Sequence, residues 1–287
     1  MRFTITAAST ALFSTWIFIE ELGLLLDAGD GVSAALAQKT KKIRHVFVSH
    51  ADRDHVAGLL QLHQLIAEDG KPAIYYPAHC GSFPALRDFV REFDPQSGPA
   101  SWAPLGVGHA IAVSPEYSVR TVGSAHIDAA PGTTKALGFV VVRSSRVLRE
   151  EFRGRSHAEI GSLRQTLGAD NVTEIREQPL IGYSGDSPTL DPASWTGVRV
   201  LLHECTFLEP ESARRAHASL SQVVSAATSL PLEALILLHF SARYSAGEIA
   251  QAVTREARAA GTKFPIFIIP PGEVVRDVLA AQPVWSA

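Results

Sequence analysis

The chain of 287 residues has little cysteine and no long apolar run. Its only cysteines, Cys80 and Cys205, are far apart and form no C-x-x-C pattern, which excludes a structural zinc finger and is typical of a reducing compartment. No stretch approaches the roughly 20 apolar residues that a membrane-spanning helix requires. Residues 1–19 are rather apolar but have no small-x-small cleavage pattern, so we interpret them as a buried hairpin. We expect a cytoplasmic protein with no membrane partner.

Strong charge is also lacking. The formal net charge is -3, which gives no overall electrostatic attraction to nucleic acid, although a local basic patch could still bind phosphates. Hydrophobic residues make up 46% of the chain and charged residues 19%, so disordered and collagen-like classes are excluded. Since no low-complexity linker divides the chain, we expect a single domain over residues 1–287.

Short apolar runs rich in β-branched and aromatic residues recur between turn residues. They predict strands at Trp16–Ile19, Leu24–Leu26, Ile43–Val48, Ala73–Tyr76, Tyr117–Val122, Leu137–Val142, Leu180–Tyr183, Val198–Leu202, Leu235–Leu238 and Pro265–Ile269. Helical spacing lies between several of them, which indicates a layered α/β fold. The stretch 81–108 is rich in Pro, Gly and Ser, has little periodicity, and predicts a loop-bearing insertion.

Four metal-competent side chains lie within six residues in the segment His50-Ala-Asp52-Arg-Asp54-His55. The segment follows an apolar run, and a helical pattern follows it. His50, Asp52 and Asp54 alternate, so an extended backbone would point them to one side, while His55 would begin the helix and approach from another direction. Such a convergence can hold two adjacent cations.

A polar turn with two ordinary surface histidines is the alternative interpretation of this segment. Three further candidates, His126, Asp186 and His239, each follow or end an apolar run. A single histidine in an apolar setting is usually a structural core residue. Three such positions together with the central segment favour a functional site.

The ordered motifs resemble those of the metallo-β-lactamase superfamily and, within it, ribonuclease Z. The resemblance covers most of the chain and rests on Leu24-Leu-Leu-Asp27-Ala-Gly-Asp30-Gly, the central segment, Leu201-Leu-His203-Glu204-Cys-Thr-Phe207, His217-Ala-Ser219 and His239-Phe-Ser-Ala-Arg-Tyr244. It implies the α/β metallo-β-lactamase fold, which is a four-layered αββα sandwich of two mixed sheets flanked by helices.

The resemblance also implies two divalent metal ions and a role for each candidate residue. His50, Asp52 and His126 would ligate the first ion. Asp54, His55 and His239 would ligate the second ion, and Asp186 would bridge the two. Asp27 would support a ligand, and Glu204 with His217 would handle protons. A buried structural pair is an equal alternative for Glu204 and His217.

One residue departs from the family pattern His-x-His-x-Asp-His, because Asp52 stands where the second histidine belongs. Zinc is the expected metal of such a site. A carboxylate is an anionic, harder ligand than imidazole and shifts the preference toward iron or manganese. The diiron flavoproteins of the superfamily likewise carry a carboxylate here, in their case Glu. Alternatively, Asp52 is too short to reach, and the first site is weak or empty.

A second departure concerns RNA. Ribonuclease Z enzymes grip the tRNA elbow with a protruding arm, typically inserted between the motifs that here carry His126 and Asp186. This interval holds five arginines followed by a predicted helix from Ser156 to Leu167: Arg143, Arg146, Arg149, Arg153 and Arg155. We expect it to be too short and too compact for the arm, and we interpret the arginines as an exposed strand end.

The leading hypothesis is hydrolysis of a phosphodiester or related ester, in a small molecule or nucleotide, by a hydroxide held between two metal ions. Asp54 would orient or deprotonate the water, and Glu204 with His217 would protonate the leaving oxygen. The alternatives are a tRNA 3′-end endonuclease, which the charge does not favour, a thioester, lactone or lactam hydrolase, and a non-catalytic metal-binding sensor or scaffold. The oligomeric state stays open, a homodimer included.

Overall fold

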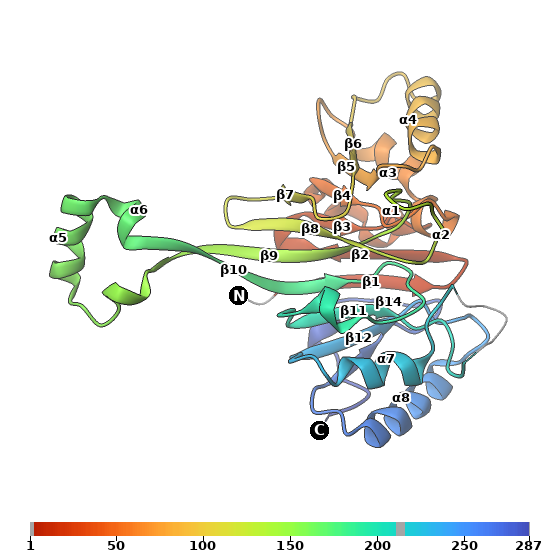
Figure 1. Cartoon of the computed structure of the whole chain (residues 1–287). Coiled ribbons are helices and arrows are strands. Elements are labelled where there is room, and N and C mark those ends of the chain that lie inside the picture. The colour runs from red at the N-terminus through yellow and green to blue at the C-terminus, as the bar shows by residue number, and fades with distance from the viewer. Residues whose placement is uncertain (1–2, 211–215, 287) are drawn as a thin grey trace.

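The computed structural model describes residues 3–210 and 216–286, which build two seven-stranded mixed sheets flanked by helices (Figure 1). The first sheet has the spatial order β14 (Val274–Val275), β1 (Ile5–Thr10), β2 (Ser14–Ile19), β3 (Leu24–Leu26), β4 (His45–Phe47), β5 (Ala73–Pro77) and β6 (Ser101–Leu105). The second has the order β13 (Ile266–Ile268), β12 (Ala234–Leu238), β11 (Val200–Glu204), β10 (Thr173–Tyr183), β9 (Leu137–Leu148), β8 (Tyr117–Gly123) and β7 (Ala110–Ala112).

Helices connect the parallel strands and cover the outer faces of the sheets, except for α5 and α6, which lie between the antiparallel strands β9 and β10. The α-helices are α1 (Val32–Leu36), α2 (Arg53–Val56), α3 (Leu59–Ile66), α4 (Ser82–Phe93), α5 (His157–Leu167), α6 (Ala169–Val172), α7 (Leu220–Ala227) and α8 (Ala246–Ala260). Short 3₁₀ helices lie at Glu20–Leu22, Ala37–Lys42, Glu150–Phe152, Pro192–Trp195 and Val278–Ala280. Within the described ranges, no helix has both the length and the apolar character needed to cross a membrane.

The main core lies between the two sheets, because alternate side chains of each strand point to opposite faces. On β2, Ile17 and Ile19 join this central core, while Trp16 and Phe18 pack against the helices of the first sheet. On the second sheet, alternate residues of β9 join a cluster formed with α7 and α8. The layers run helix, sheet, sheet, helix, so the predicted αββα sandwich is confirmed.

Each apolar run identified as a strand coincides with a strand, and residues 5–19 form the expected buried hairpin of β1 and β2. The interpretation of 81–108 as a loop-bearing insertion is only partly right. It contains the twelve-residue α4, whose Phe83 and Val90 are buried, and the edge strand β6, which pairs in parallel with β5. Pro84 misled the prediction, since a proline in the first helical turn removes no intrahelical hydrogen bond.

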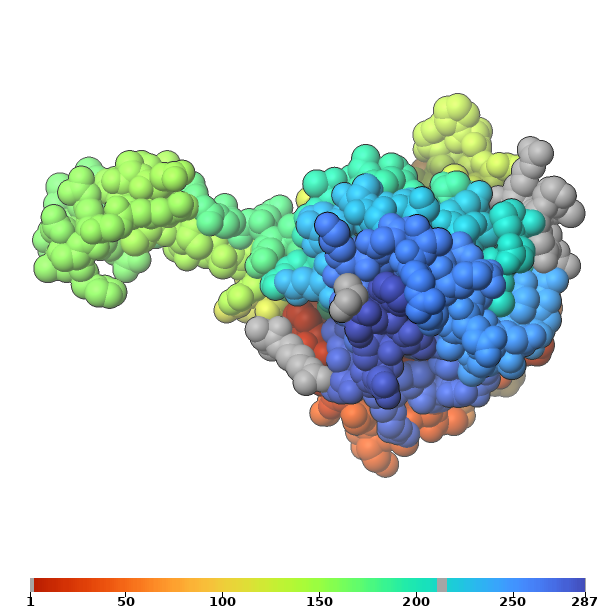
Figure 2. All heavy atoms as spheres, turned by 90° about the horizontal axis from the view of Figure 1, so that it is seen from below, coloured from red at the N-terminus to blue at the C-terminus, as the bar shows by residue number. Residues whose placement is uncertain are grey.

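The prediction that the interval between His126 and Asp186 is too compact for an arm is wrong. Strands β9 and β10 pair antiparallel from Phe139↔Tyr183 out to Leu148↔Thr173 and carry α5 and α6 far from the sandwich (Figures 1 and 2). On β9, only residues 137–142 are buried. The six residues beyond them extend the ribbon by roughly 20 Å.

The cause of the error is that the outer ribbon has no buried face. Its strands do not show the apolar alternation that marks a half-buried strand, so the sequence pattern stopped at Val142. The expectation of exposed arginines is confirmed for Arg146, Arg153 and Arg155, whereas Arg143 and Arg149 are half-buried. Arg143 pairs with Glu116, and Arg146 pairs with Asp170.

Candidate metal centre

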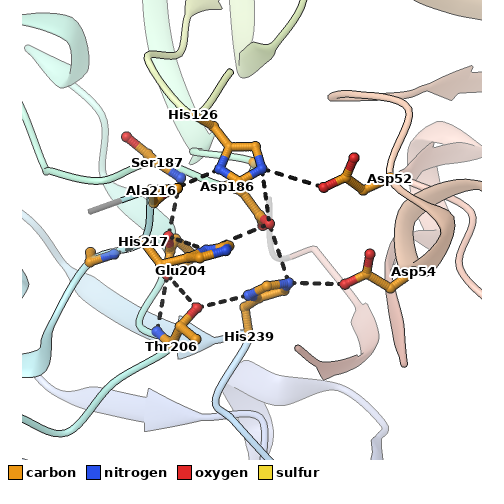
Figure 3. Close-up of polar contacts among 12 residues, drawn as sticks. Asp52, Asp54, His126, Asp186, Ser187, Glu204, Thr206, Ala216, His217 and His239 are labelled. Carbon is orange, nitrogen blue, oxygen red and sulfur yellow. Dashed lines mark hydrogen bonds and ion pairs between the residues drawn. The ribbon is translucent and has the colours of Figure 1, made fainter. Parts of the chain in front are cut away.

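The predicted site residues meet at one edge of the sandwich, where strands end and loops begin (Figure 3). His50 follows β4, Asp186 follows β10, Glu204 ends β11 and His239 follows β12. These strands have parallel neighbours, whose carboxyl ends lie at the same edge of a sheet. His126 joins them from the loop between β8 and β9.

Asp52 occupies the N-cap position of α2 but makes no side-chain capping hydrogen bond. An N-cap aspartate usually accepts a hydrogen bond from an amide in the first turn. Here its Oδ2 lies 3.5 Å from Nε2 of His50 and 3.5 Å from Nε2 of His126, and Figure 3 shows the contact with His126. The side chain is therefore long enough to reach the same space as these two imidazoles, which removes the reason for expecting a weak first site.

Four imidazoles each form a hydrogen bond through Nδ1 that faces away from the centre. The acceptors are Ser49 Oγ for His50 at 2.9 Å, Asp27 Oδ2 for His55 at 2.7 Å, the Ala216 carbonyl for His126 at 3.0 Å and Thr206 Oγ1 for His239 at 3.0 Å. Because Nδ1 carries the hydrogen in each ring, the neutral tautomer leaves the Nε2 lone pair directed inward.

The inward-facing atoms form two adjacent groups. Asp52 Oδ2 lies with Nε2 of His50 and His126 in the first, and Asp54 Oδ2 lies 3.3 Å from His239 Nε2 in the second. The second group also contains His55, whose Nε2 is 3.4 Å from that of His239.

Asp186 lies between the two groups. Its Oδ2 is 3.7 Å from His50 Nε2 and 3.4 Å from His239 Nε2, and its Oδ1 is 3.3 Å from His55 Nε2. All seven residues expected to be ligands are thus brought together, in the grouping expected from the sequence.

Among the residues that the structure describes, two buried atoms at this centre have no hydrogen-bond partner: His50 Nε2 and Asp186 Oδ1. An unsatisfied buried polar atom costs about 1–3 kcal/mol, and both atoms point to where ligand atoms cluster. Imidazole nitrogens and carboxylate oxygens are the ligands that zinc, iron and manganese accept. The residues present therefore fit divalent metal ions.

The charges of the centre are mutually dependent. Burial opposes ionisation of Asp186, but the neighbouring His239 and His55 outweigh it and hold the pKa of this carboxyl well below its usual range. Burial likewise opposes protonation of His126, but Asp52 and Asp186 prevail and raise its pKa to about 9.

Backbone conformation holds two of these residues in place. Gly185 has φ +58°, and a Cβ there would lie 2.8 Å from Ser49 Cβ and 2.9 Å from the Leu137 carbonyl oxygen. Only glycine brings Asp186 this close to the segment after β4. His239 itself has φ 63°, which is strained for a non-glycine residue and is typical of functional sites.

Glu204 and His217 form a pair beside the second group (Figure 3). His217 Nδ1 lies 3.1 Å from Glu204 Oε1 and 3.8 Å from Asp186 Oδ2. Glu204 is fully buried, and its carboxylate also accepts hydrogen bonds from the amides of Ser187, Ala218 and Thr206 and from the Thr206 hydroxyl. The partly exposed His217 ring is therefore held by a fixed anion.

Of the residues that hold the ligand side chains in place, only Asp27 was predicted. Asp27 was expected to support a ligand, and its carboxylate contacts His55 and accepts hydrogen bonds from Ser49 and Tyr183. The contributions of Ser49, Thr206 and Tyr183 were not expected. Ser49 precedes His50 and Thr206 lies two residues after Glu204, so nearness to a ligand motif was the available signal.

The centre forms the floor of a cavity of about 400 Å³. Its lining residues are Ala11, Leu12, Phe13, Asp52, Asp54, Asp186, Thr206, Phe207, Ala216, His217, His239, Ser241 and Ala242. Asp52, Asp54, Asp186, His239 and the neighbouring His217 are thus accessible from one cavity.

Known proteins resemble this chain in sequence and in fold. A family model described as the beta-lactamase superfamily domain matches residues 24–148. The tRNase Z TRZ1 of Arabidopsis thaliana is 26% identical over 256 residues, which cover 84% of this chain and 86% of the relative. The chain is a metallo-β-lactamase superfamily protein.

Solved structures agree with this membership. The metallo-β-lactamase fold protein YhfI of Bacillus subtilis superimposes with a TM-score of 0.66 at 14% identity, over 96% of this chain and 100% of that one. The short form of human tRNase Z gives 0.61 at 16% identity, over 96% and 99%. This metallo-β-lactamase superfamily protein resembles ribonuclease Z, and the prediction of an enzyme, a metal-dependent hydrolase, is confirmed.

Proposed function

We propose that this metallo-β-lactamase superfamily protein hydrolyses phosphodiesters. The observation that carries the proposal is the pair of inward-facing ligand groups, bridged by Asp186, at the floor of a cavity that His217 also lines. Two ions held about 3.5–4 Å apart are the usual arrangement for in-line displacement at phosphorus. A phosphodiester anion is also the ester best matched to two cations.

The metal ligands we propose are the seven residues expected from the sequence, divided as described above, with zinc in both sites and iron or manganese as the alternatives that Asp52 favours. Divalent ions bound there would supply Lewis acidity and would make water a nucleophile near neutral pH.

Three residues of the chain would manage the protons. Asp54 has its Oδ2 at the second group, where it can orient or deprotonate an attacking water. His217 would protonate the leaving oxygen, and the buried Glu204 would hold the His217 ring in place through Nδ1. This role goes beyond a buried structural pair because His217 lines the cavity.

Turnover of bis(p-nitrophenyl) phosphate tests this proposal. Protein stripped of metal should be inactive and should regain activity with Zn²⁺, Mn²⁺ or Fe²⁺. Parallel assays with a thioester, a lactone and a lactam determine the bond that is cleaved. Preferential hydrolysis of one of these three would overturn the phosphodiester assignment, and inactivity with all metals would support a binding role only.

A second candidate, processing of tRNA 3′ ends, is favoured by the arm of β9, β10, α5 and α6 (Figures 1 and 2). Such an arm is what ribonuclease Z enzymes use to grip tRNA, and the TRZ1 relative is named a tRNase Z. Against it, Arg143 and Arg146 are paired with acidic groups, which leaves fewer charges for phosphates. Cleavage of a precursor tRNA, with binding that falls steeply with salt, would establish this activity.

A further inference from the structure

Two large apolar side chains stand exposed at the mouth of the metal centre. The turn between β1 and β2 consists of residues 11–13, and within it Leu12 is 80% exposed and Phe13 is 65% exposed. Both line the cavity above the ligand groups. Exposed leucine and phenylalanine contribute little to folding, so their position suggests contact with a ligand.

The turn is fixed relative to the metal centre. The Leu12 amide donates a hydrogen bond of 2.9 Å to Asp54 Oδ2, and the Ala11 amide donates one of 3.1 Å to the Phe240 carbonyl, next to His239. Leu12 has φ 69°, an unfavourable conformation for a branched residue that these contacts maintain. The two side chains are therefore held at a set position beside the proposed ligands.

Apolar groups also contribute other parts of the cavity wall. Phe207, Ala216 and Ala242 line it, and the Arg243 guanidinium lies 5.3 Å from the centroid of the Phe207 ring. The cavity thus has carboxylates and imidazoles at its floor and apolar side chains along part of its wall. A ligand that fits both has an anionic end and an apolar end close together.

We propose that Leu12 and Phe13 form a subsite for a nucleobase whose attached phosphate lies at the metal centre. The inference rests on the proposed phosphodiesterase function and specifies its substrate as a nucleotide or a nucleic acid end. A base offers a flat π face to an aromatic side chain and stacks without a sequence requirement. A lipid chain would need a long apolar channel, whereas this cavity has about 400 Å³.

Binding of two phosphates by the zinc-loaded protein tests the subsite without turnover. Adenosine 5′-monophosphate and ribose 5-phosphate share sugar and phosphate and differ in the base. By calorimetry, the nucleotide should bind more tightly. Phe13→Ala should weaken nucleotide binding by about 5-fold to 150-fold, the range of one base–aromatic stack, and leave ribose phosphate binding unchanged.

Three further variants make the result specific. Phe13→Leu keeps an apolar side chain but loses the ring, so it should retain only part of the preference for the base. Leu12→Gly keeps the amide that contacts Asp54 and tolerates the positive φ, and should also weaken nucleotide binding. Phe93→Ala removes an equally exposed phenylalanine on α4, outside the cavity lining, and should change nothing.

The outcomes separate the subsite from the activity. Equal binding of the two phosphates by the wild type, no binding of either, or an equal loss of both in Phe13→Ala with zinc content unchanged would overturn the subsite even if bis(p-nitrophenyl) phosphate is hydrolysed. A base preference that depends on Phe13 in a protein without phosphodiesterase activity would support the subsite and refute the proposed function.

Discussion

At the scale of single residues, the geometry of the metal centre depends on the histidine side chains and equally on the residues that accept hydrogen bonds from their Nδ1 atoms. Thr206 shows this most directly. Its hydroxyl donates to Glu204 and accepts from His239 Nδ1, so one side chain links the proposed proton donor pair to a proposed ligand. Removal of the hydroxyl takes away the acceptor of the buried His239 Nδ1 and one of the several hydrogen bonds that Glu204 accepts.

Thr206→Val should therefore lower metal affinity or turnover by about 10-fold to 100-fold, the usual effect of losing a group that orients a ligand. Valine matches the shape of threonine but lacks the hydroxyl, so the substitution removes the hydrogen bonds while leaving the packing volume nearly unchanged. Thr206→Ser keeps the hydroxyl and serves as the control. Zinc affinity from competition with a chelator is the measurement, and equal affinities for the Val and Ser variants would refute the role of the hydroxyl.

His126 makes metal binding depend on pH. Its pKa of about 9 in the metal-free protein lies above the ordinary value of 6.5, so its proton stabilises the metal-free fold below pH 6.5 and this contribution is lost as the pH rises through 9. Metal must displace that proton. Zinc binding near pH 7 should release about one proton from His126, with affinity rising toward pH 9. Calorimetry in buffers of different ionisation enthalpy measures the release, and heats that do not depend on the buffer would contradict it.

The sequence predicted the proposed metal ligands better than the residues that form hydrogen bonds to those ligands. His50, Asp52 and Asp54 share a motif, which identified them as candidates. The expected extended backbone through Asp54 is wrong, because α2 begins at Arg53 and places Asp54 in the second ligand group with His55. Thr206 contacts His239, which lies 33 residues further along the chain, and spacing in the sequence does not encode that contact. The reach of Asp52 likewise depended on the position of His126, which lies over 70 residues away in the sequence.

At the scale of elements, the arm is the part of the fold that the sequence did not predict. Strands were identified where burial imposes apolar alternation, and the outer parts of β9 and β10 have no such requirement. Their pairing is dictated instead by the inner ribbon, which sets the register from Phe139↔Tyr183 outward. The helix α5 was predicted correctly because its capping box at Ser156 and Glu159 is local.

Deletion of the arm tests whether the protein acts on a small phosphodiester or on a precursor tRNA. Replacing residues 145–176 by Asn-Gly joins Ser144 to its register partner Glu177 through a two-residue hairpin. Metal content and bis(p-nitrophenyl) phosphate turnover should stay within about twofold, as expected for a change remote from buried features. Cleavage of precursor tRNA, if the protein catalyses it, should be lost. A loss of metal together with the arm would show that the arm supports the centre.

At the scale of the whole molecule, the ligand groups come from both sheets. His50, Asp52, Asp54 and His55 follow the first sheet's β4, whereas His126, Asp186 and His239 follow strands of the second sheet. Bound metal would thus connect the two halves of the sandwich. The layered architecture was predictable because periodic apolar runs define strands, while the juxtaposition of the two sheet edges arises only from packing.

Metal should therefore stabilise the entire fold. At a free zinc concentration 100 times Kd, binding adds about 2.7 kcal/mol to the free energy of unfolding, which corresponds to roughly 5–10 °C in Tm for a protein of this size. Thermal unfolding with and without a chelator measures the difference. The same Tm in both conditions would argue against sites that span the two halves.

The metal content of Asp186→Ala tests the central claim most directly, because Asp186 Oδ2 lies 3.7 Å from His50 Nε2 in the first ligand group and 3.4 Å from His239 Nε2 in the second. Wild-type protein loaded with zinc should contain two ions per chain and hydrolyse bis(p-nitrophenyl) phosphate. The variant should contain fewer ions and lose turnover, measured by elemental analysis and assay of the same sample. Two ions and full turnover in Asp186→Ala would contradict the assignment of this site.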